Sequence, residues 1–143
     1  MKKVSFQEMV DRIVSEQPRY DAQAYYFLRE ALDFTIKLFE KPVEGPARHV
    51  SGGELLDGIR KYALQEFGPL TKTVLNRWNI QRCEDFGEIV FTMVEKGVLG
   101  KTDEDRKEDF SGGYDFDTAF RKPFRPTTQR VVAASSLDSL PIR

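Results

Sequence analysis

The sequence predicts an all-α fold, a compact bundle of about five helices followed by an irregular C-terminal segment. Two Ser-x-x-Glu capping boxes, Ser5–Glu8 and Ser51–Glu54, are typical of helix starts. Apolar residues recur at helical spacing through residues 5–96. A proline or glycine stands where most of these periodic segments end. With 143 residues, 40% of them hydrophobic, the chain can bury a core as a single domain.

The first two helices are predicted from their caps and their apolar residues. The capping box at Ser5 begins a helix over about 6–16, which Pro18 ends. Asp21 is a suitable N-cap for a second helix over 22–40. Apolar side chains cover most of the circumference of that second helix, and such a helix is normally buried on several sides. We therefore expect helix 22–40 at the centre of the fold.

Three further helices are predicted between the second capping box and Gly97. They cover 51–67, 69–78 and 84–96, with Gly68 and Pro69 separating the first from the second. The lengths of these helices match those of a trihelical unit like that of a winged helix, over 51–96. We expect this unit to pack around the central helix.

The exposed face of helix 84–96 argues against sequence-specific DNA binding. In a winged helix-turn-helix this helix would enter the major groove. Its exposed face is expected to carry four carboxylates opposed only by Lys96, those of Glu84, Asp85, Glu88 and Glu95. Such a face repels the phosphates of a duplex.

The segment after the five helices is rich in aromatic residues and ends in a basic tail. The charged run 103–109 predicts a solvated turn, and the rings that follow are expected to lie on the helical body: Phe110, Tyr114, Phe116, Phe120 and Phe124. Residues 82–120 have a net charge of −6, whereas residues 121–143 have a net charge of +4. Prolines and serines replace the periodicity from Arg121 onward. We expect a helical domain over 1–120 and a flexible tail over 121–143.

This C-terminal region is the candidate docking arm for a partner. Its candidate binding residues are Phe116, Phe120, Arg121, Lys122, Phe124, Arg125 and Arg130. Cations interleaved with rings and prolines suit an acidic protein surface or an RNA, bound in extended form. The tail could instead fold back on the acidic segment and neutralise it.

A second candidate binding groove lies at the start of helix 51–67. It consists of Arg48, His49, Ser51 and Glu54. His49 is the sole histidine, and its unperturbed pKa of about 6.5 suits acid–base chemistry. Helix amides together with Arg48 could also bind a phosphate. Neither a second histidine nor an evident nucleophile accompanies His49, and the capping box uses the amides, so we expect a groove rather than a catalytic centre.

Several cofactor and metal sites are not expected. Cys83 is the only cysteine, which excludes an internal disulfide and a cysteine-based zinc site. Asp85-Phe86-Gly87 matches a kinase tripeptide by letter, but the other kinase motifs are missing. The acidic run over 103–109 places a glutamate where a calcium loop needs glycine. We therefore expect no cofactor and no metal.

The chain is expected to stay in the cytoplasm. Its apolar runs are far shorter than the ~18 residues of a membrane span. The first residues lead into an amphipathic segment rather than into the apolar stretch of a signal peptide. No membrane association is expected, and the pattern does not specify the oligomeric state.

Several short motifs resemble those of a family of small bacterial proteins. They are Arg48-His49-Val50-Ser51-Gly52 with Glu54-Leu55-Leu56, Phe67-Gly68-Pro69, Trp78, the run Glu84-Asp85-Phe86-Gly87-Glu88-Ile89-Val90-Phe91, Lys101-Thr102 and Gly113-Tyr114-Asp115-Phe116. The family is known mainly from planctomycetes and verrucomicrobia, and the resemblance covers roughly residues 5–120. Gly53 stands where a polar residue is expected. The resemblance implies no activity, cofactor or partner.

Taken together, these features predict a non-catalytic interaction or regulatory module. It would bind a partner protein through the aromatic segment over 110–124 and the basic tail. One alternative is a protein associated with RNA or the ribosome, or a nucleic-acid-binding protein of winged-helix type. A second alternative is an enzyme centred on His49.

Overall fold

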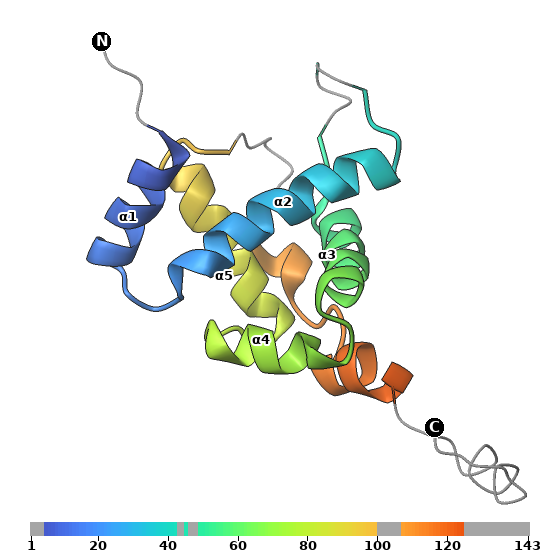
Figure 1. Cartoon of the computed structure of the whole chain (residues 1–143). Helices are drawn as coiled ribbons and strands as arrows, with labels where there is room; N and C mark the ends of the chain where they lie inside the picture. The colour runs from blue at the N-terminus through green and yellow to red at the C-terminus, as the bar shows by residue number, and fades with distance from the viewer. Residues whose placement is uncertain (1–4, 43–44, 46–48, 100–106, 125–143) are drawn as a thin grey trace, which may run out of the picture.

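The computed structural model describes residues 5–42, 45, 49–99 and 107–124, and the regular secondary structure of this part is all helical (Figure 1). It contains five α-helices and no strand, which confirms the predicted all-α class. The helices are α1 (Phe6–Glu16), α2 (Ala22–Leu38), α3 (Gly52–Phe67), α4 (Thr71–Arg77) and α5 (Cys83–Glu95). Four short helical turns accompany them: η2 (Gly68–Leu70), η3 (Lys107–Phe110), η4 (Asp117–Arg121) and η5 (Lys122–Phe124).

Both predicted capping boxes form at helix starts. In α1, the Ser5 hydroxyl accepts the Glu8 amide at 3.1 Å, and the Glu8 carboxylate accepts the Ser5 amide at 2.9 Å. The same reciprocal pair opens α3.

Helix α2 ends at Leu38, two residues before the predicted end, because Glu40 adopts a left-handed backbone with a φ of 53°. The Lys41 amide then donates back to the Ile36 carbonyl at 2.9 Å.

The predicted helix 69–78 is divided into the turn η2 and helix α4. Gly68 adopts a φ of 53° after α3, a backbone conformation that suits glycine. The Thr71 hydroxyl lies where the chain enters α4 and donates to the Gly68 carbonyl at 2.6 Å. Helix α5 begins at Cys83 and ends at Glu95, one residue earlier at each end than predicted.

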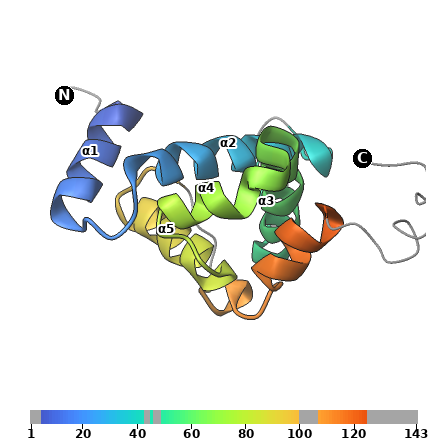
Figure 2. The ribbon, with the colours of Figure 1, turned by 60° about the horizontal axis from the view of Figure 1, so that its bottom comes forward.

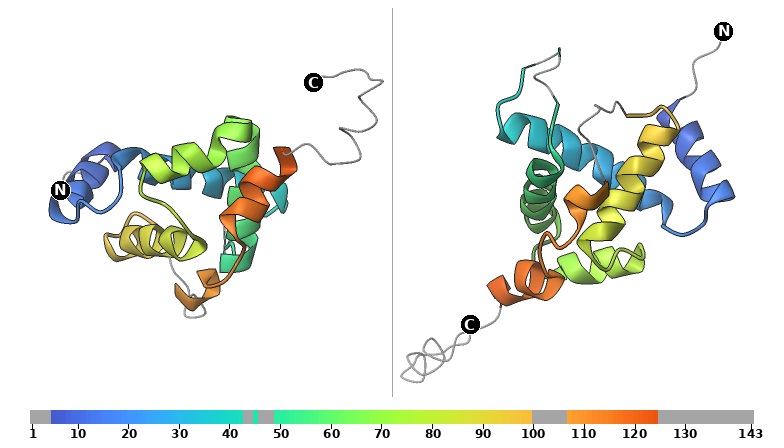
Figure 3. Two further views of the ribbon diagram at one scale, coloured as in Figure 1. Left: turned by 90° about the horizontal axis from the view of Figure 1, so that it is seen from below. Right: turned by 180° about the vertical axis from the view of Figure 1, so that it is seen from behind.

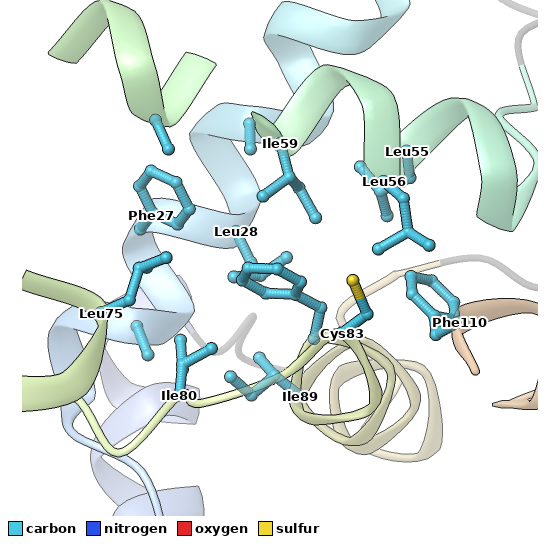
Figure 4. Close-up of a cluster of buried hydrophobic side chains, with 14 of the residues drawn as sticks. Phe27, Leu28, Leu55, Leu56, Ile59, Leu75, Ile80, Cys83, Ile89 and Phe110 are labelled. Atoms are coloured by element: carbon cyan, nitrogen blue, oxygen red, sulfur yellow. The ribbon is translucent and has the colours of Figure 1, made fainter. Parts of the chain in front are cut away.

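Helix α2 crosses the molecule, and α3 and α5 pack against it (Figure 1). The contact with α3 is close, because a Cβ at Gly58 would lie 2.7 Å from the Cβ of Thr35. Phe27 of α2 contacts the rings of Tyr62, Phe67 and Trp78, at centroid distances of 5.5, 5.8 and 5.5 Å. The buried cluster continues from Phe27 to side chains of α3, α4 and α5 (Figure 4). Helix α2 is therefore the central helix, as predicted.

Residues 107–124, which we call the C-terminal strap, complete the core. Its first turn, η3, contacts both α3 and α5, and η4 contacts α3 and α4 (Figures 2 and 3). Phe110, Phe116 and Phe120 are only 3%, 4% and 0% exposed. Two glycines allow the strap to approach: a Cβ at Gly52 would lie 2.6 Å from the Cβ of Asp109, and one at Gly113 would lie 2.5 Å from Leu56 Cδ1. The aromatic segment thus lies on the helical body, as expected.

The start of the predicted tail belongs to this strap. Arg121 is the last residue of η4, and residues 122–124 form η5. The rest of the predicted tail, 125–143, lies outside the described residues. So does most of the predicted solvated turn, residues 103–106.

Candidate functional site

Two of the four residues predicted to form a groove act as the N-terminal cap of α3. The Ser51 hydroxyl accepts the Glu54 amide at 3.1 Å, and Glu54 Oε1 accepts the Ser51 amide at 3.0 Å. Lys41 Nζ lies 3.1 Å from the same carboxylate oxygen. The Ser51 amide, with help from Lys41, lowers the pKa of Glu54. These interactions give both side chains a structural role. His49 is half-buried before the helix, and Arg48 lies outside the described residues.

The lone cysteine is a core side chain. Cys83 is 1% exposed, and its thiol lies 3.4 Å from the Tyr114 carbonyl, to which it donates. Figure 4 shows it inside the buried cluster, near Leu56 and Phe110. Burial raises the pKa of the Cys83 thiol to about 11. Since the thiolate is the reactive form, this side chain is not suited to nucleophilic chemistry.

The predicted exposure of Asp85 is wrong. Its side chain is buried, and its carboxylate accepts the Tyr20 hydroxyl at 2.6 Å and the amides of Gln81 and Arg82 at 2.8 and 3.2 Å. Arg19 lies 3.6 Å away. Burial, together with the hydrogen bond to Asp85, raises the pKa of Tyr20. Asp85 therefore ties the α1–α2 loop to the start of α5.

Helix α5 presents only part of the exposed acidic face that was predicted: Glu95 is exposed, whereas Glu84 and Glu88 are half-buried. Besides the burial of Asp85, the Glu84 carboxylate accepts the Ser111 hydroxyl and the Gly112 amide of the strap, both at 3.3 Å. A Cβ at Gly87 would lie 3.0 Å from Phe110, so the strap also covers the middle of the helix. A helix covered in this way cannot enter a DNA groove along that side.

Two residues of the predicted docking arm are not accessible. Phe116 and Phe120 are buried, with ring centroids 5.0 Å apart, and both rings contact Tyr114. Their place in the core corrects the prediction that these two rings bind a partner. Phe124, at the end of η5, is 45% exposed.

The exposed residues of the arm lie in η4 and η5, and the neighbouring turn η2 adds exposed apolar residues that the sequence did not predict. Leu70 is 62% exposed, the most exposed large hydrophobic side chain of the part of the chain that the structure describes. It follows Pro69 in η2, just as Phe124 follows Pro123 in η5. Turn η2 contacts η4, which continues directly into η5. All four of these apolar residues are exposed.

Three cations accompany these apolar residues. Lys72 Nζ and Arg121 Nε lie 3.4 and 3.7 Å from the same oxygen of Asp117. The ion pair of Lys72 with Asp117 connects α4 to η4. The side chain of Arg121 is still 57% exposed, and that of Lys72 31%. Lys122 is exposed beside them. We call this surface the docking corner; it consists of Pro69, Leu70, Lys72, Arg121, Lys122, Pro123 and Phe124.

Neither a metal site nor a membrane span is found among the described residues. Within 5–42, 45, 49–99 and 107–124, no group of three or more His, Cys, Asp or Glu side chains could hold a metal ion. No helix in these ranges is long and apolar enough to span a bilayer.

Comparison with known proteins gives no match. No family model, no curated protein and no solved structure matches the chain. The resemblance to a bacterial family therefore stays a prediction.

Proposed function

We propose that the protein is a non-catalytic interaction module of the cytoplasm, which binds a partner protein through the docking corner. The exposure of Leu70 and Phe124, at 62% and 45%, is the observation that carries this proposal. These two side chains lie on turns that both contact η4, and apolar residues gathered with a polar rim are typical of an interaction surface. The proposal keeps the accessible part of the predicted docking arm and replaces its two buried rings with η2.

The backbone of the corner suits binding because it is already ordered. Pro69 and Pro123 each fix a backbone dihedral immediately before the exposed hydrophobic residue. Thr71 holds the end of η2 through its bond to Gly68, and the Phe120 ring, 0% exposed, holds η4. A surface that is ordered before binding loses less conformational entropy when a partner binds.

Site-specific photo-crosslinking in the producing cell would test the proposal. A benzophenone amino acid would replace Phe124 in one variant and Leu70 in another. Leu38 and Phe39, which are 38% and 37% exposed at the end of α2, provide matched control positions. We expect both corner positions to crosslink to the same protein, and the α2 positions not to crosslink to it.

Two results would contradict the proposal. One is the same set of crosslinks from the corner and from the control positions, since this would indicate non-specific collision. The other is the absence of any protein crosslink at Leu70 and Phe124 when the chain is expressed at its natural level.

RNA binding is a second candidate, because an exposed ring lies next to exposed cations. Phe124 could stack on a base while Arg121 and Lys122 face phosphates. The predicted RNA-binding residues Arg125 and Arg130 lie outside the described residues. Irradiation of a cell lysate with and without prior nuclease treatment distinguishes the two candidates: a direct protein partner stays crosslinked at Phe124, whereas contacts made through RNA disappear.

A further inference from the structure

The docking corner is small, which limits the kind of partner that it can bind. Its apolar part consists of two large side chains and two prolines. An interface between two folded proteins buries about 800 Å² on each side, which is some 20–30 residues. A surface of this size suits a short linear segment, in which one or two anchoring side chains supply most of the binding energy.

The charges of the corner indicate the chemistry of that segment. Residues 68–77 contain Lys72 and Arg77 and no acidic residue, and residues 118–124 contain Arg121 and Lys122 and no acidic residue. Asp117 already lies between two of these cations, at 3.4 and 3.7 Å. Asp115 caps the following turn through the amide of Thr118, at 3.0 Å. The corner as a whole therefore has an excess of positive charge.

Resting on the proposed function, we infer that the partner presents a short acidic segment with one or two large apolar side chains. The apolar side chains pack on Leu70 and Phe124, and the carboxylates of the segment face Lys72, Arg121 and Lys122. Exposed charge pairs contribute more to specificity and association rate than to affinity. The apolar anchors therefore hold the segment, and the charges select it.

Fluorescence anisotropy with the full chain and labelled synthetic dodecapeptides tests this inference. The first peptide alternates glutamate with leucine and phenylalanine. The second carries serine in place of the apolar residues, and the third carries lysine in place of glutamate. An oligouridylate of equal length serves as the nucleic-acid probe. We expect the first peptide to bind at least about tenfold more tightly than the other three ligands, and its binding to weaken as salt is raised.

Charge reversal at the corner provides the second arm of the test. The double variant Arg121→Glu with Lys122→Glu should weaken binding of the first peptide at least about tenfold at low salt. The double variant Arg12→Glu with Lys37→Glu reverses two exposed charges on α1 and α2 and should leave binding unchanged. Leu70→Asp should abolish binding, because it removes an anchor and adds a repelling charge.

The outcomes separate this inference from the proposed function. Equal or tighter binding of the lysine peptide or of the oligouridylate would overturn the acidic partner. A failure of every peptide to bind would also overturn it. Crosslinking at Phe124 and Leu70 would still support the proposed function in either case, because it does not depend on the charge of the partner.

Discussion

Asp85 and Tyr20 form a buried polar contact in a mainly apolar interior. Asp85 is 5% exposed, so donors from the protein must replace the water that would solvate its carboxylate. The Tyr20 hydroxyl and two backbone amides provide these donors, at 2.6, 2.8 and 3.2 Å. A buried carboxylate satisfied in this way fixes one geometry at the start of α5.

The substitution Asp85→Asn should lower the free energy of unfolding by about 2–3 kcal/mol. The amide cannot accept all three bonds as a carboxylate does, and it lacks the negative charge that strengthens them. Asp21→Asn is the matched control, because Asp21 is exposed and asparagine is an equally good N-cap. Urea denaturation measures both changes; equal stability of the two variants would contradict the structural role of Asp85.

Phe120 and Phe124 provide a second comparison at the residue scale. Phe120 is 0% exposed and Phe124 is 45% exposed, although only four residues separate them. Phe120→Ala should destabilise the fold by about 3–5 kcal/mol through the cavity that it leaves. Phe124→Ala should change the stability by no more than about 0.5 kcal/mol. Thermal and urea unfolding would measure both changes. The reverse order would contradict the burial of Phe120 and the exposure of Phe124.

At the scale of single elements, the contact between α2 and α3 depends on a glycine. The Thr35 hydroxyl donates to the Ala31 carbonyl at 2.7 Å within α2, and Gly58 of α3 leaves the space in which this side chain lies. Any side chain at Gly58 would push the two helices apart. Gly53 lies five residues earlier in α3, and a Cβ added there would meet no side chain and no other segment within 4 Å.

Alanine substitution of these two glycines should therefore have opposite effects. Gly58→Ala should destabilise the protein by about 1–3 kcal/mol, because Thr35 cannot move without losing its bond. Gly53→Ala should be neutral, or stabilise by about 0.5–1 kcal/mol, because alanine restricts the unfolded chain. The midpoints of urea unfolding report both effects, and a stabilising Gly58→Ala would disprove the close approach.

The ends of the helices were predictable because local residues determine them. The capping boxes at Ser5 and Ser51, Asp21 and Gly68 act on amides and carbonyls a few positions away, and the predicted ends differ from the observed ones by two residues or fewer. Asp85 was misplaced because its partner Tyr20 is 65 positions away along the chain. A periodicity pattern contains no information about a contact of that kind.

The strap shows what helical periodicity could not predict at the scale of the whole molecule. Its rings were expected to lie on the helical body, but the sequence did not show which of the rings would be buried. Phe116 and Phe120 are buried against the helices, whereas Phe124 at the end of η5 is exposed. Only the assembled helices distinguish these positions, and for the same reason Leu70 could not be recognised as exposed.

The whole molecule therefore depends on the strap as a wall of its core. Phe110 covers Gly87 of α5, and Gly113 lies against Leu56 of α3 and Cys83 of α5. The Tyr114 hydroxyl donates to the Leu56 carbonyl at 2.8 Å, which adds a polar contact to the same wall. Without these residues, apolar side chains of α3 and α5 would be exposed to water. The last turn of the strap, η5, carries Phe124 and belongs to the docking corner.

Urea unfolding of two shortened chains tests most directly whether the strap is a wall of the core. One chain would end after Phe124 and the other after Arg106, and circular dichroism would follow the helices. We predict a single cooperative transition for the longer chain, and loss of the transition or a much lower midpoint for the shorter one. Equal midpoints would contradict this role, because they would show that residues 107–124 are an appendage on a core that is complete without them.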